Sequence, residues 1–128
     1  MTIHHVGFAV ENLETAIATY EKLGFTLSRT FEKPEPKARV ASMKDAKGTG
    51  LELWQFQEEH PLRGYIGRHT AFLCENVQND YRVLLDAGFR EVIPFTKGVI
   101  MDYVFMKDKN GLVYELAQEK NTSGSEGK

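Results

Sequence analysis

An internal repeat restricts the possible folds of this chain more than any other feature. Residues 5–25 read HVGFAVENLETAIATYEKLGF and residues 69–89 read HTAFLCENVQNDYRVLLDAGF, so six of 21 positions are identical at a constant shift of 64. Both copies place an apolar run, a Glu-Asn pair, a helical pattern and a Gly-Phe pair in the same order. The same order of structural signals in two places indicates two copies of one supersecondary unit.

Each copy is predicted to form a strand, a helix and three further strands. Residues 3–10 and 69–75 are apolar and rich enough in β-branched or aromatic residues for the first strands. Asn12 and Asn76 are expected to cap the two helices, and glycines at 24 and 88 to end them. The apolar stripes of the helices are Leu13, Ile17, Tyr20 and Leu23 in the first copy, and Val77, Tyr81, Leu84 and Leu85 in the second. The remaining strands are expected at about 25–32, 38–44, 50–57, 89–94, 99–107 and 112–118.

Length and composition indicate one ordinary globular domain. The chain has 128 residues, of which 41% are hydrophobic and 27% charged. We expect a single domain over 1–120 and a disordered polar tail over 121–128. Within the domain, module 1 covers about 1–58, a linker about 59–66 and module 2 about 67–118.

Charge and cysteine content exclude several classes of function. The net charge is -2 with both signs interspersed, which does not favour a nucleic-acid partner. No apolar run approaches the roughly 20 residues that a membrane helix needs, and the N-terminus lacks the pattern of a signal peptide. Cys74 is the one cysteine, so no intrachain disulfide can form. These features fit a cytoplasmic protein.

Two His…Glu pairs at nearly equal spacing accompany the repeat. His5 precedes Glu52 by 47 residues, and His69 precedes Glu115 by 46. Side chains alternate across a strand, so His5 shares a face with the small residues Gly7 and Ala9. The opposite face carries His4 and three large apolar residues expected to pack on the helix: Val6, Phe8 and Val10.

The two glutamates lie in the middle of predicted strands. Glu52 stands between Leu51 and Leu53, which should pack on the helix, and Glu115 stands between Tyr114 and Leu116. An isolated buried carboxylate is very costly, so each must be paired, protonated or bound to a metal. Two imidazoles and two carboxylates suit one divalent ion of Ni, Co, Zn, Mn or Fe. Such an ion polarises a carbonyl, and a loosely held carboxylate can move a proton on the neighbouring carbon.

Simpler interpretations exist for each of these residues. A single strand histidine is more often a satisfied polar group than a ligand, and a single mid-strand glutamate usually faces solvent. His60 before Pro61 is expected to be solvated, and Cys74 to be a small core residue. Trp54 and Phe56 could line a pocket or pack between the modules.

The chain resembles the glyoxalase/bleomycin-resistance/dioxygenase family, also called the vicinal oxygen chelate superfamily. The resemblance covers nearly all of residues 3–118. It lies in the strand 3–10 with Leu13, Ala16, Tyr20 and 23–25 and, in the second half, in 69–72, 88–89, 105–111 and 114–116. It implies an α+β fold in which two tandem βαβββ modules form an open cup-shaped mixed β-barrel with two flanking helices. By the same resemblance, the metal ligands of this chain are His5, Glu52, His69 and Glu115.

Within the superfamily the ligand set most resembles that of glyoxalase I, which isomerises the glutathione hemithioacetal of methylglyoxal. That resemblance makes Glu115 the leading base and Glu52 its counterpart. Glyoxalase I, however, carries an arginine for a glutathione carboxylate at the position of Ala9. An expected asparagine is replaced by the apolar run around Trp54 and Phe56. These three residues are therefore the predicted substrate pocket, for a small molecule more apolar than glutathione.

Two other functions within the superfamily stay open. An epimerase acting on an acyl-coenzyme A, similar to methylmalonyl-CoA epimerase, uses the same proton chemistry, but usually has a glutamine near the position of Glu52. A metal-free protein that sequesters an antibiotic, similar to bleomycin-resistance proteins, lacks the ligand set. The resemblance also implies a homodimer, whose sites could lie within one chain or between two subunits.

Overall fold

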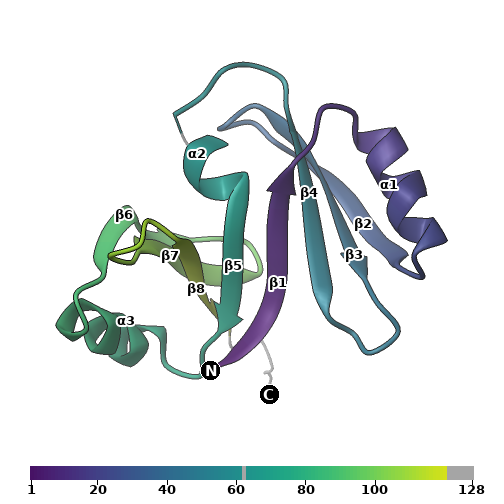
Figure 1. Ribbon diagram of the computed structural model, residues 1–128. Coiled ribbons are helices and arrows are strands. Elements are labelled where there is room, and N and C mark those ends of the chain that lie inside the picture. The colour runs from purple at the N-terminus through teal and green to yellow at the C-terminus, as the bar shows by residue number, and fades with distance from the viewer. Residues whose placement is uncertain (62, 121–128) are drawn as a thin grey trace. The chain divides into compact units, whose positions relative to one another are not determined.

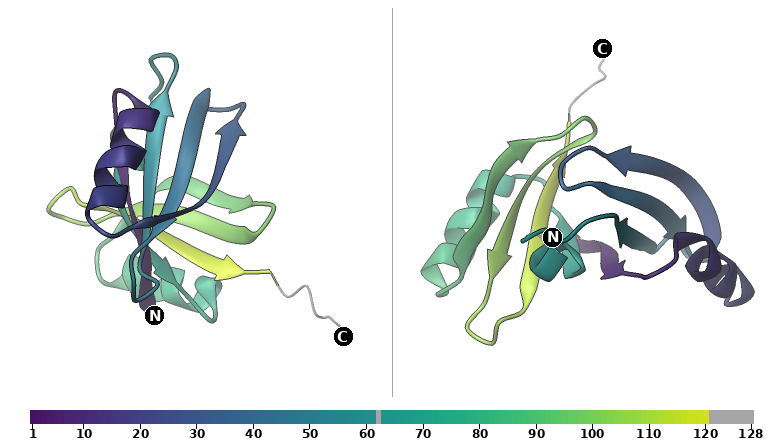
Figure 2. Two further views of the ribbon diagram at one scale, coloured as in Figure 1. Left: turned by 90° about the vertical axis from the view of Figure 1, so that its right-hand side faces the viewer. Right: turned by 90° about the horizontal axis from the view of Figure 1, so that it is seen from above.

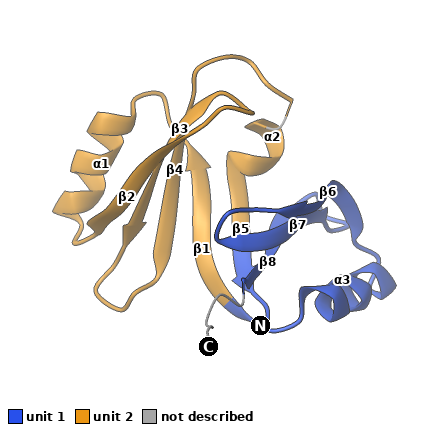
Figure 3. Ribbon diagram, turned by 180° about the vertical axis from the view of Figure 1, so that it is seen from behind, with its two compact units in different colours: residues 1–2, 71–128 blue, residues 3–70 orange. Residues whose placement is uncertain are grey.

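The computed structural model describes residues 1–61 and 63–120. Contacts between Cα atoms divide the chain into two compact units, unit 2 over residues 3–70 and unit 1 over residues 1–2 and 71 onward (Figure 3). The boundary falls inside strand β5 (Arg68–Leu73), which begins in unit 2 and continues into unit 1. The predicted disordered tail, 121–128, lies outside the described residues.

Unit 2 is built on the strand order β2-β3-β4-β1-β5 (Figure 1). The strands are β1 (Thr2–Ala9), β2 (Thr26–Lys33), β3 (Ala38–Lys44) and β4 (Gly50–Phe56), followed by the start of β5. β2, β3 and β4 are antiparallel neighbours, and β1 runs parallel to β4 with Gly7 opposite Glu52. The amide of Ala9 donates to the carbonyl of Gly67, 2.8 Å away, and so joins β1 to the segment that leads into β5.

Helix α1 (Leu13–Lys22) covers one face of this sheet (Figure 2). Its apolar stripe packs on the strands because Leu13, Ile17 and Tyr20 recur at helical spacing. The buried centre of this core consists of Leu13, Ala41, Met43, Leu51 and Leu53. Leu51 and Leu53 therefore face the helix, as the alternation along β4 predicted.

Unit 1 repeats the arrangement with the strand order β5-β8-β7-β6. Its elements are α3 (Val77–Asp86), β6 (Arg90–Lys97), β7 (Met101–Lys107) and β8 (Val113–Glu119), with the antiparallel pairs β6/β7 and β7/β8. Its core consists of Cys74, Val77, Val104, Met106 and Leu116. The expected α+β fold, with βαβββ occurring twice in tandem, is confirmed.

The repeat extends to individual hydrogen bonds at the start of each helix. The side chains of Asn12 and Asn76 accept from backbone amides three residues later, at 2.9 and 3.0 Å. A glutamine from the last strand of each module also reaches the first helical amide: Oε1 of Gln55 accepts from Leu13 at 2.6 Å, and Oε1 of Gln118 from Val77 at 2.8 Å. Both helix starts are thus satisfied twice, once locally and once from the sheet.

The turns before the last strands repeat in the same way. Asp45 and Asp108 each accept two backbone N–H groups with one carboxylate oxygen, at 2.8–2.9 Å. Gly48 and Gly111 follow with φ of 87° and 88°, a conformation that a side chain would strain. The turns that end at Gly48 and Gly111 therefore have the same geometry.

Three expectations about apolar residues are wrong. Leu23 is 67% exposed because it is the C-cap of α1, beyond the last helical turn. Leu85 is 40% exposed because it stands at the edge of the stripe that Val77 and Leu84 centre. Phe8 is 41% exposed, although Val6 and Val10 on the same face of β1 do pack against the core under α1. In addition, the predicted linker 59–66 contains a one-turn helix, α2 (Arg63–Ile66).

Candidate metal centre

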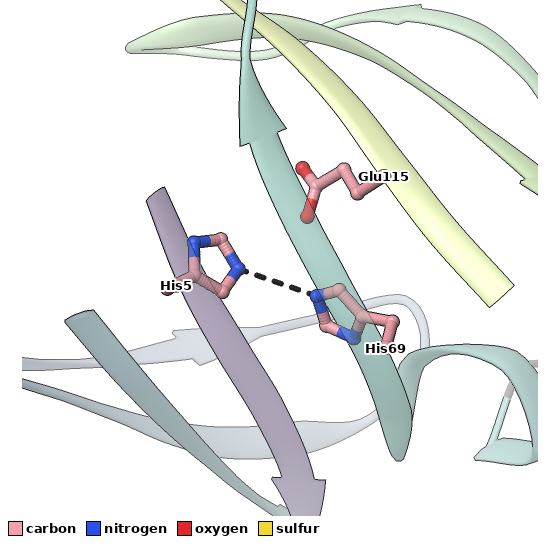
Figure 4. A group of neighbouring side chains, drawn as sticks. All are labelled: His5, His69 and Glu115. Carbon is pink, nitrogen blue, oxygen red and sulfur yellow. Dashed lines mark hydrogen bonds between the residues drawn. The ribbon is translucent and has the colours of Figure 1, made fainter. Parts of the chain in front are cut away.

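His5 and His69 bring their ring nitrogens together in the interior of unit 2. His5 comes from β1 and His69 from β5, and their Nε2 atoms are 3.2 Å apart (Figure 4). The rings meet edge to face, with 5.3 Å between their centroids. The two residues are only 5% and 6% exposed, and they are the buried polar residues of the described chain. Two imidazoles that are 64 residues apart in sequence are thus in contact in the buried interior.

Glu52 reaches the same nitrogen from β4. The parallel register sets Glu52 opposite Gly7, two residues from His5, so its side chain can extend toward the histidine. Its Oε1 lies 3.4 Å from Nε2 of His5, and the side chain is 20% exposed. The same oxygen accepts a hydrogen bond of 3.1 Å from the indole N–H of Trp54. Trp54 therefore fixes the carboxylate that faces His5.

Nε2 of His5 is surrounded by more hydrogen-bond acceptors than it can satisfy by donating one proton. Nδ1 of His69 lies 2.6 Å from the carbonyl oxygen of Ile66, which can only accept, so this nitrogen carries the proton. An imidazole with its one proton on Nδ1 offers Nε2 as an acceptor. His5 Nε2 therefore faces two acceptors, Nε2 of His69 and Oε1 of Glu52, and can satisfy only one of them with a proton. A cation beside Nε2 of His5 would remove this conflict.

The two distances from Nε2 of His5 are those expected between neighbouring ligand atoms of one metal ion. Nitrogen and oxygen ligands lie about 2.0–2.2 Å from a divalent ion such as zinc, so neighbouring ligand atoms are about 3.0–3.5 Å apart. The observed distances from His5 Nε2 are 3.2 Å to His69 and 3.4 Å to Glu52. The chemistry of these side chains and their two distances from His5 suit the predicted ion.

Two glycines make room for the histidines. A Cβ on Gly7 would lie 2.3 Å from Cε1 of His69, and one on Gly50 would lie 2.7 Å from the backbone oxygen of His4 and 2.9 Å from Cβ of His5. Cβ atoms essentially never make contacts this short, so a side chain at position 7 would displace the imidazole of His69, and one at position 50 would push against the strand that carries His5. The small-residue face predicted for β1 is therefore the space that the ring of His69 fills.

Glu115 belongs to β8 of unit 1 and is half-buried there. It pairs in register with Phe105 of β7. Burial, and after it the charge of Glu115, raises the pKa of the Tyr103 phenol. Tyr103 was not predicted as a site residue, because its proximity to Glu115 depends on the register of β7 against β8. The role of Glu115 as a fourth ligand stays a prediction.

The predicted pocket residues lie at the C-terminal ends of two neighbouring strands of unit 2, Ala9 on β1 and Trp54 and Phe56 on β4. Trp54 stacks on Phe56 with 5.8 Å between ring centroids, and the guanidinium of Arg63 lies 5.9 Å from the Phe56 ring centroid. Trp54 is 7% exposed, and Ala9 is half-buried beside Gly67. Contact of these side chains with a substrate stays a prediction, but Trp54 has a second role as hydrogen-bond donor to Glu52.

Two residues outside the site, His60 and Cys74, differ in how well they match the expectation from sequence. His60 is not merely solvated, because its Nε2 lies 2.6 Å from Oε1 of Glu35 and its side chain is only 25% exposed. Cys74 is a small core residue as expected, being 4% exposed in the core under α3. Burial raises the pKa of the Cys74 thiol to about 12.

Comparisons with known structures support the fold. Over 97% of this chain and 98% of the other, a hypothetical protein from Bacillus halodurans matches with 18% identity and a TM-score of 0.79. The methylmalonyl-CoA epimerase of Mycobacterium tuberculosis matches with 22% identity and a TM-score of 0.78, over 93% of this chain and 88% of the enzyme. A second structure of a methylmalonyl-CoA epimerase gives 21% identity and 0.77, over 94% and 97%. At these identities the likeness shows the fold alone.

Comparison at the sequence level then gives the family. None of the described helices is long and apolar enough to cross a bilayer. Among curated proteins, none matches the chain significantly. The model of the Glyoxalase/Bleomycin resistance protein/Dioxygenase superfamily matches residues 2–116, nearly the whole described chain. The duplicated βαβββ fold, the buried histidine pair and this match agree, and the chain belongs to the glyoxalase/bleomycin resistance protein/dioxygenase superfamily.

Proposed function

We propose that this protein is a metal-dependent enzyme that moves a proton on the carbon next to a carbonyl of its substrate. His5, Glu52, His69 and Glu115 would hold one divalent ion of Ni, Co, Zn, Mn or Fe. The observation that carries this proposal is the convergence of His69 Nε2 and Glu52 Oε1 on Nε2 of His5, at 3.2 and 3.4 Å. Imidazole nitrogens and carboxylate oxygens are ligand atoms of the kind that such ions accept.

When bound, the ion would act as a Lewis acid that polarises the substrate carbonyl and stabilises negative charge on its oxygen. The protein supplies the proton transfer. Glu115 is the proposed base, and Glu52, tethered by the indole N–H of Trp54, is its counterpart. The phenol of Tyr103 is protonated at neutral pH like that of any tyrosine, and burial and the charge of Glu115 raise its pKa further, so it is proposed as a donor beside Glu115.

The reaction class we favour is an isomerisation or lyase reaction of the glyoxalase I type, similar to that of lactoylglutathione lyase. A matched set of two histidines and two glutamates supports it. The substrate, however, would differ from a glutathione adduct. Ala9 offers no charge to a glutathione carboxylate, and the stacked pair of Trp54 and Phe56 presents an apolar wall. We therefore propose a small, more apolar substrate with two neighbouring oxygens.

A second candidate is epimerisation of an acyl-coenzyme A. Two of the similar structures are methylmalonyl-CoA epimerases, and the proton chemistry is the same. Arg63 could meet an anionic part of such a ligand, since its guanidinium already lies over the Phe56 ring. Its ion pair with Glu11 is long, at 3.7 Å, and half exposed on the arginine side. A third candidate is metal-free sequestration of an antibiotic. It gives no reason for Nε2 of His5 to face two acceptor atoms, Nε2 of His69 and Oε1 of Glu52.

The first experiment is elemental analysis of untagged protein, with one transition metal expected per site. Assays with added nickel, cobalt or zinc would then compare the methylglyoxal–glutathione hemithioacetal with methylmalonyl-CoA. Metal with turnover of the first substrate supports the glyoxalase type, and turnover of the second supports the epimerase. Tight drug binding by metal-free protein would support the third candidate instead.

The second experiment tests whether Glu115 acts as the catalytic base or only supports the fold. We expect Glu115→Gln to lower turnover about 100-fold or more while the protein keeps its fold, since general-base catalysis contributes roughly 10²–10⁴-fold. Glu119→Gln, an exposed carboxylate on the same strand, is the matched control. Full turnover in Glu115→Gln would remove this residue from the mechanism. A homodimer and a cytoplasmic location are further parts of the proposal, and light scattering of the purified protein tests the first.

A further inference from the structure

We propose that His4 is a positioning residue for the candidate metal centre: its Nδ1 accepts the Nδ1 proton of His5 and so turns Nε2 of His5 toward the ion as a lone pair. This inference rests on the metal site proposed above. His4 itself is not a proposed ligand. The sequence pattern predicts it on the face of the strand opposite to that of His5.

The two neighbouring histidines are in direct contact. Nδ1 of His4 lies 2.9 Å from Nδ1 of His5, and the rings meet edge to face with centroids 5.2 Å apart. Consecutive side chains of a strand point to opposite faces, so two such rings touch only when each turns toward the other. His4 is half-buried, which keeps this contact partly shielded from water.

The contact determines which nitrogen of His5 can bind a metal. A neutral imidazole carries one proton, and a ligand nitrogen must be free of it. With Nε2 of His5 facing His69 and Glu52, its proton must sit on Nδ1 when the ion is bound. That proton needs an acceptor, and Nδ1 of His4 is placed to be one. Partners of this kind hold the ring orientation and tautomer of a metal-bound histidine.

The second histidine has an equivalent partner of a different kind. Nδ1 of His69 donates to the carbonyl oxygen of Ile66 at 2.6 Å. The residue that corresponds to His4 in the repeat is Arg68, which is exposed and has no acceptor to offer. Both buried histidines thus have their Nδ1 atoms engaged, one by the backbone before β5 and one by His4. The two halves reach the same result with different groups.

The test compares two substitutions at one position. His4→Asn keeps an acceptor, because the amide oxygen can take the His5 proton, whereas His4→Phe keeps a ring without one. We expect His4→Phe to weaken zinc or cobalt affinity about 10–100-fold in a competition titration with a chelator, and His4→Asn to stay close to the unchanged protein. The visible spectrum of the cobalt form should change in His4→Phe alone. Arg68→Phe, at the repeated position, is the control and should change neither readout.

Proton-detected nitrogen NMR of the zinc-loaded protein gives an independent readout. His5 should appear with its proton on Nδ1, and this signal should move or exchange faster in His4→Phe. Equal affinity and equal spectra for His4→Phe and the unchanged protein would overturn the role of His4 while leaving the metal site intact. Absence of any metal binding by the unchanged protein would overturn both proposals. If His4→Phe does not fold, as judged by circular dichroism, His4→Ala takes its place in the same comparison.

Discussion

The imidazole of His69 lies directly against the backbone of Gly7, where an added Cβ would come within 2.3 Å of Cε1. Because the ring is buried and its Nδ1 is bound to Ile66, it cannot move aside without losing that hydrogen bond. We expect Gly7→Ala to weaken metal affinity at least about tenfold, comparable to loss of a partner that orients a ligand. Chelator competition measures this effect. Gly64→Ala, where an added Cβ meets nothing within 4 Å, should retain the affinity of the unchanged protein.

Trp54→Phe should loosen Glu52. The substitution removes an indole N–H that donates to Oε1 at 3.1 Å and leaves the stacking on Phe56 largely in place. A hydrogen bond to a charged group contributes about 1.5–3 kcal/mol when buried, and the partial exposure of Glu52 places the loss at the lower end. Urea unfolding should show a decrease of about 1.5 kcal/mol, and metal affinity should fall severalfold. An unchanged affinity would mean that Trp54 does not orient this carboxylate.

The glutamines that reach from the sheet to the helix starts should matter equally in both modules. Gln55→Leu and Gln118→Leu each leave the first helical amide without its side-chain acceptor. We expect a loss of about 1 kcal/mol in the free energy of unfolding for each, the usual effect of removing a helix cap. Thermal or urea denaturation measures it. Gln57→Leu, at an exposed position just after β4, is the control that should have little effect.

The thiol of Cys74 should be inert in the folded protein. Burial raises its pKa to about 12, whereas an unfolded cysteine titrates near 8.5. The stabilisation that follows from the protonated thiol is fully present below about pH 8.5 and is lost as the pH rises toward 12. A thiol reagent at pH 8 should therefore react slowly with native protein and rapidly in urea. The difference in stability between the unchanged protein and Cys74→Ala should narrow between pH 9 and 12, and rapid labelling of native protein would contradict the burial.

The order of helices and strands could be predicted because its signals are local. Asn12, Gly24 and their counterparts at 76 and 88 act within one helical turn, and each does what its side chain or conformational freedom predicts. The apolar stripes were predicted correctly at their centres and wrongly at their edges. Leu23 and Leu85 are apolar without being buried, since whether an edge residue is covered depends on the width of the sheet beneath the helix.

The candidate site could be predicted only in part. The equal spacing of the His…Glu pairs pointed to His5, Glu52, His69 and Glu115, and the structure places His69 and Glu52 of this set within 3.4 Å of Nε2 of His5. The residues that support them were missed because they depend on strand register and ring rotation. Trp54 reaches Glu52 only because both lie on one face of β4, and His4 contacts His5 only by turning against the usual alternation.

The supporting hydrogen bonds of the two modules have a consequence for how the chain can change. Caps, sheet-to-helix braces and aspartate turns are duplicated almost atom for atom, and each module has its own core. Positions that differ between the copies, such as Trp54 and its counterpart Ala117, lie outside that shared frame. One copy could therefore acquire a new lining for its inner surface by successive substitutions while the other kept its original chemistry, with neither frame having to be rebuilt.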